Sequence, residues 1–269
     1  MQARVVPTSG GVRWLVDGWR IFRAAPLGWL AIVVAYVVFT NVLAVVPAIG
    51  VPAALILVPP LSFGLMVAAR AAERGALLEL ATLFSGLRPP VARAQLLLGV
   101  GYMACSLAVY AAMVLSDTDG ALRVLLSGRA NPEDFDVMDL FVPLAVAAAA
   151  YTPVMMAFWF APPLAGWQGM GAAKAAFFSF VACTLNWRPF LAYGIAAGVV
   201  LVVVPFAVLS TVMIASGGAL RLTVMGLAFP LLLVMLPILF ASFYASYRDI
   251  FGEMQGETHE ERSAGAPPP

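Results

Sequence analysis

The chain has 269 residues, of which 62% are hydrophobic and only 11% are charged, and its net charge at pH 7 is +1. Soluble globular domains carry about 25% charged residues, so this composition excludes a soluble globular protein and is typical of an integral membrane protein. The near-zero net charge gives no support for a nucleic-acid partner, which would require a basic surface.

The first uncharged stretch is long enough for two membrane spans. Between Arg23 and Arg70 lie 46 residues without a charged side chain, and Pro47, Gly50 and Pro52 divide them into two halves. A helix needs about 20 apolar residues to cross a bilayer core of about 30 Å. The pattern therefore predicts a transmembrane hairpin.

Four further uncharged stretches follow, with 23, 34, 32 and 26 residues after Arg93, Asp139, Arg188 and Arg221. Each is long enough for one span. The sequence thus predicts an all-α integral membrane protein with six transmembrane helices, at about residues 27–47, 51–69, 94–116, 141–163, 189–215 and 224–247. Residues 1–251 are expected to form a single transmembrane domain, and residues 252–269 a disordered cytoplasmic tail.

The basic residues are distributed unequally between the two sides of these spans. One side has three: Arg123, Arg129 and Arg221. The other side has twelve: Arg4, Arg13, Arg20, Arg23, Arg70, Arg74, Arg88, Arg93, Lys174, Arg188, Arg248 and Arg262. Because basic loops stay in the cytoplasm, we expect a multi-pass protein of the bacterial inner membrane with both termini in the cytoplasm.

Prolines recur at equivalent places in the spans. The first, third and fifth spans begin with an arginine followed closely by a proline: Pro26, Pro89 and Pro189. The first turn of a helix tolerates the missing N–H of proline. The even spans carry a proline 10 or 11 residues before a basic residue: Pro60, Pro163 and Pro237. Three hairpins on one plan are the simplest interpretation, and chance recurrence of such short motifs is the alternative.

An amphipathic segment precedes each odd span. Apolar residues recur at helical spacing in all three segments: Val12, Leu15, Val16, Trp19 and Phe22; Leu77, Leu80, Phe84 and Leu87; Phe177, Val181 and Leu185. Polar side chains occupy the opposite faces, so each segment is predicted to be a helix lying in the cytoplasmic interface. Such helices anchor a protein in membrane lipids or offer a docking surface to a protein partner.

Asp, Glu, Lys, Arg and His are absent from all six predicted spans. Ion-coupled pumps place such groups at membrane depth, so the absence argues against active transport. The single histidine, His259, lies beside Glu260 and Glu261 in the tail, with no nucleophile or second metal ligand at a recognised spacing. We therefore expect no enzyme activity, no catalytic residue, no metal site and no cofactor.

The polar content of the spans is neutral. Four side chains are candidate ligand-binding residues: Asn41, Tyr102, Tyr151 and Tyr193. An unpaired amide or hydroxyl in hydrocarbon is costly, so these groups either line a polar cleft or form hydrogen bonds between helices. Gly194 and Gly198, four residues apart, predict close helix packing of the fifth span.

Both ends of the chain carry motifs: Ala3-Arg4-Val5, Gly11, Trp14, Gly18-Trp19 and Phe22 at the amino end, and Tyr244-Ala245-Ser246-Tyr247-Arg248-Asp249-Ile250-Phe251 at the carboxyl end. Together with Pro59-Pro60, Pro162-Pro163 and Arg188-Pro189, they resemble a family of uncharacterised proteobacterial inner-membrane proteins over about residues 1–252. A more distant similarity is to membrane domains fused to glycerophosphodiester phosphodiesterases, although no phosphodiesterase domain is present. The resemblance implies a location and a topology, and no catalytic residues.

These observations favour a non-enzymatic inner-membrane protein that serves as an accessory or scaffold in envelope or lipid processes. The alternative is a passive transporter or binder of a lipid or small neutral solute, which would use the neutral polar side chains. Membrane lipids are the expected partners in both cases. A protein partner is expected at the interfacial helices, and no nucleic-acid partner is expected.

Overall fold

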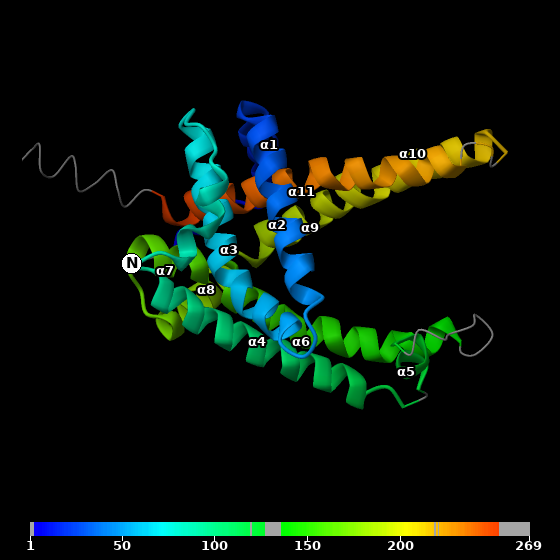
Figure 1. The fold of residues 1–269 in the computed structure, drawn as a ribbon, viewed down its shortest axis with the longest axis horizontal. Helices are drawn as coiled ribbons and strands as arrows, with labels where there is room; N and C mark the ends of the chain where they lie inside the picture. Colours follow the sequence, from blue (N-terminus) through cyan, green and yellow to red (C-terminus); the bar gives the residue numbers. More distant parts are fainter. Residues whose placement is uncertain (1–2, 119, 127–135, 218, 220, 253–269) are drawn as a thin grey trace, which may run out of the picture. The chain divides into compact units, whose positions relative to one another are not determined.

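The computed structural model describes residues 3–118, 120–126, 136–217, 219 and 221–252, and all regular structure within them is helical (Figure 1). The predicted tail lies outside the described residues except for Gly252. The all-α class expected from the composition is therefore confirmed for the described part of the chain.

The α-helices are α1 (Ser9–Ala24), α2 (Pro26–Ala44), α3 (Gly50–Glu73), α4 (Ala92–Leu115), α5 (Ala121–Leu126), α6 (Phe141–Trp159), α7 (Ala161–Gln168), α8 (Ala172–Leu185), α9 (Trp187–Gly198), α10 (Val204–Ala215) and α11 (Arg221–Phe251). Short 3-10 helices form at η1 (Leu80–Leu87) and η2 (Val137–Leu140). A π-helical turn, η3 (Val199–Val203), joins α9 to α10.

Five helical stretches of the described chain are long and apolar enough to cross a membrane: Pro26–Ala44, Gly50–Glu73, Ala92–Leu115, Met138–Gln168 and Leu233–Phe251. They coincide with five of the predicted spans. The remaining predicted span, residues 189–215, is helical throughout, but α9, η3 and α10 divide it into segments that are each shorter than a membrane span. The membrane class is thus supported by length and composition of the helices.

The predicted interfacial segments are also helical. The first forms α1 and the third forms α8, whereas the second forms the 3-10 helix η1, with Leu77 outside it. Only part of the predicted apolar face of α1 is exposed: Val12, Val16 and Trp19 are exposed, while Leu15 and Phe22 are buried. One part of the apolar face of α1 therefore packs inside the protein, and the other part faces outward.

The fourth predicted span is broken near its end. Helix α6 ends at Trp159, and Pro162 and Pro163 lie in the first turn of the separate helix α7, where their missing N–H groups cost little. The hydroxyl of Ser179 bridges the break, because it accepts from the Phe160 N–H at 2.8 Å and donates to the Met156 carbonyl at 2.7 Å. Backbone groups freed by the break are thereby satisfied inside the protein, as hydrocarbon requires.

The described chain divides into two compact units. The first unit combines Met1–Val42, Leu61–Gly86 and Ala182–Pro269, and the second combines Leu43–Pro60 and Leu87–Val181. In the second unit α4 packs along α6. Gln95 of α4 is fully buried and donates its Nε2 hydrogen to the Pro162 carbonyl at 2.7 Å.

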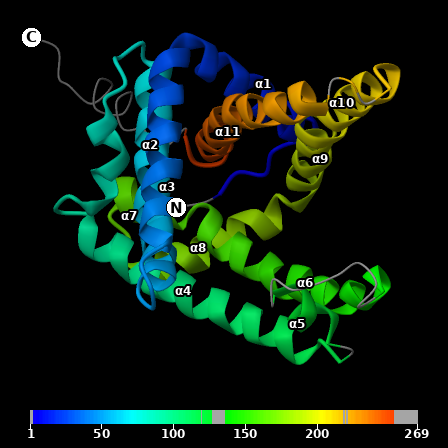
Figure 2. The same cartoon turned by 45° about the vertical axis from the view of Figure 1, so that its right-hand side comes forward.

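In the first unit, α1 packs against α9 and α11 (Figure 2). Two glycines of α1 bring the backbones together. A Cβ atom at Gly11 would lie 2.1 Å from the Pro189 carbonyl oxygen, and one at Gly18 would lie 2.6 Å from the Ile238 carbonyl oxygen. Small residues at such crossings are typical of closely packed membrane helices.

Within the first unit, Gly194 and Gly198 take no part in close packing of the described helices. No described atom lies within 4 Å of a Cβ atom built at either position. Their spacing was a correct signature of small residues on one helix face, but helix α1 supplies the glycines at the actual crossings, and these are seven residues apart.

Candidate functional site

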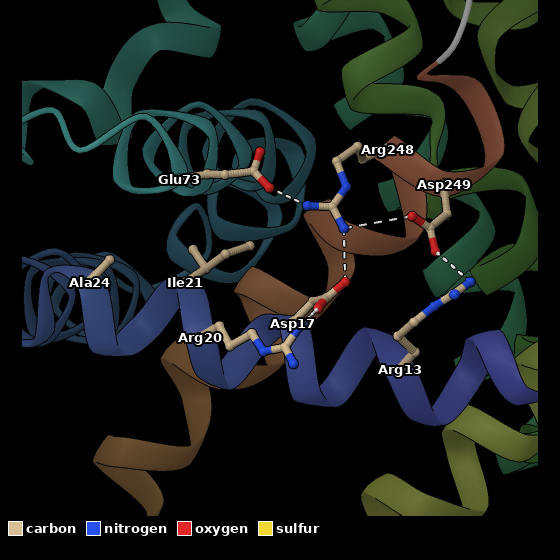
Figure 3. A pocket seen from close by; sticks show the side chains of 8 residues that line it. All are labelled: Arg13, Asp17, Arg20, Ile21, Ala24, Glu73, Arg248 and Asp249. Atoms are coloured by element: carbon tan, nitrogen blue, oxygen red, sulfur yellow. Dashed lines mark hydrogen bonds and ion pairs between the residues drawn. The ribbon is translucent and has the colours of Figure 1, made fainter.

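The polar side chains of the first unit meet where the carboxyl ends of α3 and α11 approach α1 (Figure 3). Arg248 of α11 contacts Glu73 of α3 through Nη1. Its Nη2 atom lies 2.8 Å from Oδ2 of Asp17 on α1 and 3.6 Å from Oδ1 of Asp249. We call these four residues the Arg248 network; its single cation faces three carboxylates.

Neighbouring side chains extend this network. The Trp14 indole, which is fully buried, donates its N–H to Oδ2 of Asp249 at 3.0 Å. Tyr244 donates its hydroxyl to Oε2 of Glu73 at 2.8 Å. Two arginines of α1 complete the charge balance, because Arg20 lies 3.1 Å from Asp17 and Arg13 lies 3.8 Å from Asp249.

The helical spacing of α1 explains this arrangement. At about 100° per residue, three stripes run along the helix. Trp14, Gly18 and Ile21 belong to the stripe buried in the first unit. The charged stripe consists of Arg13, Asp17 and Arg20, and the exposed apolar stripe of Val12, Val16 and Trp19. The charged stripe lies between the buried and the exposed apolar surface.

The amino-terminal strap, residues 3–7, runs beside the network. The buried side chain of Asn186 accepts from the Val6 N–H at 2.8 Å and donates to the Arg4 carbonyl at 3.0 Å. The Arg4 N–H donates to the Ile250 carbonyl of α11 at 3.1 Å. These backbone bonds place Arg4 next to the carboxyl end of α11.

Two neighbouring pockets are formed by these elements. The larger, of about 610 Å³, is lined by Asp17, Glu73 and the other charged groups of Figure 3, so positive and negative charges balance in it. The smaller, of about 370 Å³, is lined by three arginines and one carboxylate, namely Arg4, Arg13, Arg248 and Asp249, together with neutral residues of the strap. We call the smaller one the arginine pocket.

None of the four candidate residues predicted from the sequence lines either pocket, and two of the four belong to each unit. In the second unit, the hydroxyls of Tyr102 and Tyr151 form a hydrogen bond of 2.5 Å. In the first unit, the Tyr193 hydroxyl bonds to Ser242 Oγ at 2.8 Å. Asn41 is exposed and donates to the Val37 carbonyl of its own helix at 2.8 Å. Tyr102 and Tyr151 are thus the only two of the four that the structure brings into contact with each other.

Tyr193 nevertheless belongs to the surroundings of the Arg248 network. Its ring centroid lies 6.0 Å from that of Trp14, whose N–H is bonded to Asp249. Ser242, its partner on α11, lies at the crossing with Gly18. The contacts of Tyr193 with Trp14 and with Ser242 therefore connect the crossing of α1 and α11 to the Arg248 network.

No metal centre is indicated by the geometry of the described residues, since they contain no cluster of three or more His, Cys, Asp or Glu side chains close enough to hold an ion. The carboxylates of the Arg248 network are occupied by arginine, tyrosine and tryptophan donors instead.

The Arg248 network was not predicted from the sequence, since its members lie far apart in the chain: Asp17 in the middle of α1, and Glu73, Arg248 and Asp249 at the ends of α3 and α11. One available signal pointed to them. The motif segments at the two chain ends contain Trp14, Gly18, Arg248 and Asp249, and the structure brings these segments together. Asp17 and Glu73 carried no such signal, because a single carboxylate on a helix is ordinarily a solvated surface group.

A probable inner membrane protein of Burkholderia thailandensis is 32% identical to the chain over 258 residues, which cover 94% of this chain and 94% of that protein. No family model and no solved structure matches the chain. The alignment extends over nearly the whole length of both proteins, so the similarity includes the membrane spans. The name of the relative gives a location and no activity.

Proposed function

The chain belongs to the same protein family as this probable inner membrane protein of Burkholderia thailandensis, and from that premise we propose a role as a non-enzymatic accessory or scaffold protein of the bacterial inner membrane. In this proposal six spans cross the bilayer, both termini lie in the cytoplasm, and three short helices lie in the cytoplasmic interface. The protein would serve an envelope or lipid process by presenting these helices to lipids and to a protein partner.

One observation carries the proposal: all three segments that precede the odd spans are structured and still expose large apolar side chains. Val12, Val16 and Trp19 are exposed on α1, Leu80 on η1, and Phe177 and Leu185 on α8, and Leu77 is exposed just before η1. Leu77 is 93% exposed. Large apolar side chains exposed on or next to such short helices mark a surface for lipid or for another protein.

The charges of α1 fit the same location. Arg23 lies 5.8 Å from the ring of Trp19, so a cation and an exposed indole occur together. Indoles and arginines of this kind are typical of the membrane interface, where the ring enters the lipid and the cation remains at the headgroups.

The proposed topology is tested by labelling single cysteines in a variant that lacks Cys105 and Cys183. A membrane-impermeant maleimide added to intact cells is expected to modify Gly128→Cys, in the predicted outward loop and outside the described residues. The same reagent is expected to modify Leu77→Cys only after permeabilisation, because the positive-inside rule places that segment in the cytoplasm. Labelling of Leu77→Cys but not of Gly128→Cys in intact cells would reverse the orientation.

A passive binder of a lipid or neutral solute is the second candidate, and one observation favours it. The Tyr102–Tyr151 pair lies between α4 and α6, and Ser106 follows Tyr102 by one helical turn. The Ser106 hydroxyl is buried and has no hydrogen-bond partner among the described residues. A neutral polar strip with an unsatisfied hydroxyl suits a small neutral ligand.

Mass spectrometry of gently solubilised protein distinguishes the two candidates. For the scaffold role we expect one protein partner at constant stoichiometry, lost from the variant Leu77→Ser/Leu80→Ser and retained by Val34→Ser/Val38→Ser, which changes exposed residues of α2 instead. A stoichiometric small molecule that is lost from Tyr102→Phe/Tyr151→Phe would support the binder. Absence of both would contradict both.

A further inference from the structure

We propose that the Tyr102–Tyr151 pair binds the carbonyl group of a neutral, membrane-soluble molecule. The inference rests on the second candidate function, the passive binder. It adds the polar group that the ligand must carry and the depth in the membrane at which that group is bound. Both tyrosines belong to the second unit, on the helices α4 and α6, which pack along each other.

The two tyrosines have one more hydroxyl hydrogen than the bond between them uses. Their oxygens lie 2.5 Å apart, and whichever hydroxyl donates, the hydrogen of the other is left over. Neither hydroxyl has a second hydrogen-bond partner among the residues that the structure describes. An unsatisfied donor is costly in hydrocarbon, so the pair favours a ligand that accepts a hydrogen bond.

Ser106 adds a second donor one helical turn along α4. Its hydroxyl oxygen is buried and has no partner in the described part of the chain. Thr152 and Thr211 show the usual solution for a hydroxyl in an apolar helix, since both donate to the carbonyl four residues earlier, at 2.8 and 2.7 Å. Because the Ser106 oxygen is enclosed, the tyrosine pair is the first contact of the ligand and Ser106 the second.

The surroundings of the pair exclude a charged ligand. Arg93 is the only charged residue of α4, and α6 has none. The ring of Phe158 meets that of Tyr102 edge-on, with centroids 5.3 Å apart. A charged group would have neither a counter-ion nor water beside these side chains. A carbonyl oxygen suits them, because it is neutral, has two lone pairs and brings no further donor.

The depth of the pair decides which molecules can present a carbonyl there. Tyr102 lies within two residues of the middle of Ala92–Leu115, and Tyr151 within two residues of the middle of Met138–Gln168. At about 1.5 Å per residue, both backbone positions lie within about 3 Å of the midplane of a spanning helix. The charged headgroup of a phospholipid holds its ester carbonyls near the surface, about 15 Å away. The ligand therefore has no charged headgroup, as in a quinone with an apolar chain or an uncharged glyceride.

The test is a titration of the purified full-length protein in detergent with decylubiquinone, a short-chain quinone. We expect Tyr102→Phe/Tyr151→Phe to weaken binding about tenfold, because it removes both hydroxyls. Each single variant still has one hydroxyl hydrogen for the ligand, so Tyr102→Phe or Tyr151→Phe alone should change the affinity by less than about threefold. The matched control is Tyr110→Phe, which removes an exposed hydroxyl from the same helix and should bind like the wild type.

Infrared spectroscopy distinguishes a hydrogen bond from simple partition into an apolar surface. The carbonyl stretching band of bound decylubiquinone should move to lower frequency with the wild type and with Tyr110→Phe. That shift should be lost with the double variant. If the tyrosine hydroxyls served only to hold α4 and α6 together, the band would stay unshifted in every case, which would overturn the proposal.

The variants are compared once size-exclusion chromatography has shown that they are monodisperse. Decylbenzene has the same chain without a carbonyl, and equally tight binding of it to the wild type would overturn the proposal. The decylbenzene comparison and the infrared band need the wild type alone, so they decide the proposal even if the double variant does not fold. Tighter binding of dioctanoylglycerol than of the quinone would support the carbonyl and identify an uncharged glyceride as its source.

Failure of this inference is distinguishable from failure of the binder itself. The mass spectrometry proposed above detects any stoichiometric small molecule. A co-purifying molecule that has no carbonyl and is lost from the double tyrosine variant would support the passive binder and overturn the carbonyl as the recognised group.

Discussion

Replacing Gly18 with alanine is expected to lower the free energy of unfolding by about 2–3 kcal/mol, because the crossing of α1 and α11 leaves no room for a side chain. The new Cβ atom would lie 2.6 Å from the Ile238 carbonyl oxygen and 2.8 Å from the Ser242 backbone nitrogen. Both atoms belong to helix backbone, so they cannot move aside as a flexible side chain would. The helices must separate, and the Tyr193–Ser242 bond and the Trp14–Asp249 bond beside the crossing should weaken with them.

The measurement is the thermal stability of the detergent-solubilised protein, read from the loss of its monodisperse peak after heating. Gly194→Ala is the matched control, because no described atom lies within 4 Å of the added Cβ atom. Alanine is the better helix former by about 0.5–1 kcal/mol, so this control should be as stable as the wild type or slightly more stable. If Gly18→Ala behaved like the control, the close approach of α1 to α11 would be refuted.

Replacing Arg248 with glutamine is expected to destabilise the protein by about 2–3 kcal/mol. The change leaves Asp17, Glu73 and Asp249 close together without the cation that they share. Breaking a fully buried ion pair costs about 3–5 kcal/mol. The expected value is lower because the Arg248 side chain is 36% exposed and water screens part of the repulsion.

A double variant tests whether Arg248→Gln lowers stability through the uncompensated negative charge or through lost helix packing. Adding Glu73→Gln to Arg248→Gln removes one of the three negative charges that Arg248 balances, so part of the stability should return. Arg20→Gln is the control, since Arg20 is exposed and pairs with Asp17 only at the edge of the network, and it should change stability by less than about 0.5 kcal/mol. The same thermal assay applies, and a double variant less stable than Arg248→Gln would show that Glu73 stabilises the fold by other means.

Hydropathy and charge were sufficient to determine the class of this protein and the approximate location of its helices. The long uncharged stretches became helices because, in hydrocarbon, every backbone N–H and C=O must be satisfied within its own segment. Thr40 and Asn41 illustrate the same constraint at the level of side chains, since both bond to carbonyls of their own helix, α2. These are local consequences of the sequence, and local periodicity is enough to predict them.

Tertiary structure alone decided which of these residues work together. Periodicity marked Leu15 and Val16 as one apolar face, but packing on α9 and α11 buries Leu15 and leaves Val16 exposed. The spacing of Gly194 and Gly198 predicted close contact, whereas the crossing occurs at Gly18, because a glycine brings helices together only where a partner backbone lies opposite.

The charged site depends on contacts of still longer range. Asp17 and Arg248 are separated by 231 positions, and each by itself resembles an ordinary solvated charge on a helix. Nothing in the local sequence specifies their distance, because electrostatic pairing depends on where the ends of α3 and α11 meet the middle of α1 in space. The sequence thus determined that this chain is built from membrane helices, and only the packing of α1 against α3 and α11 decided that their charged residues form one site.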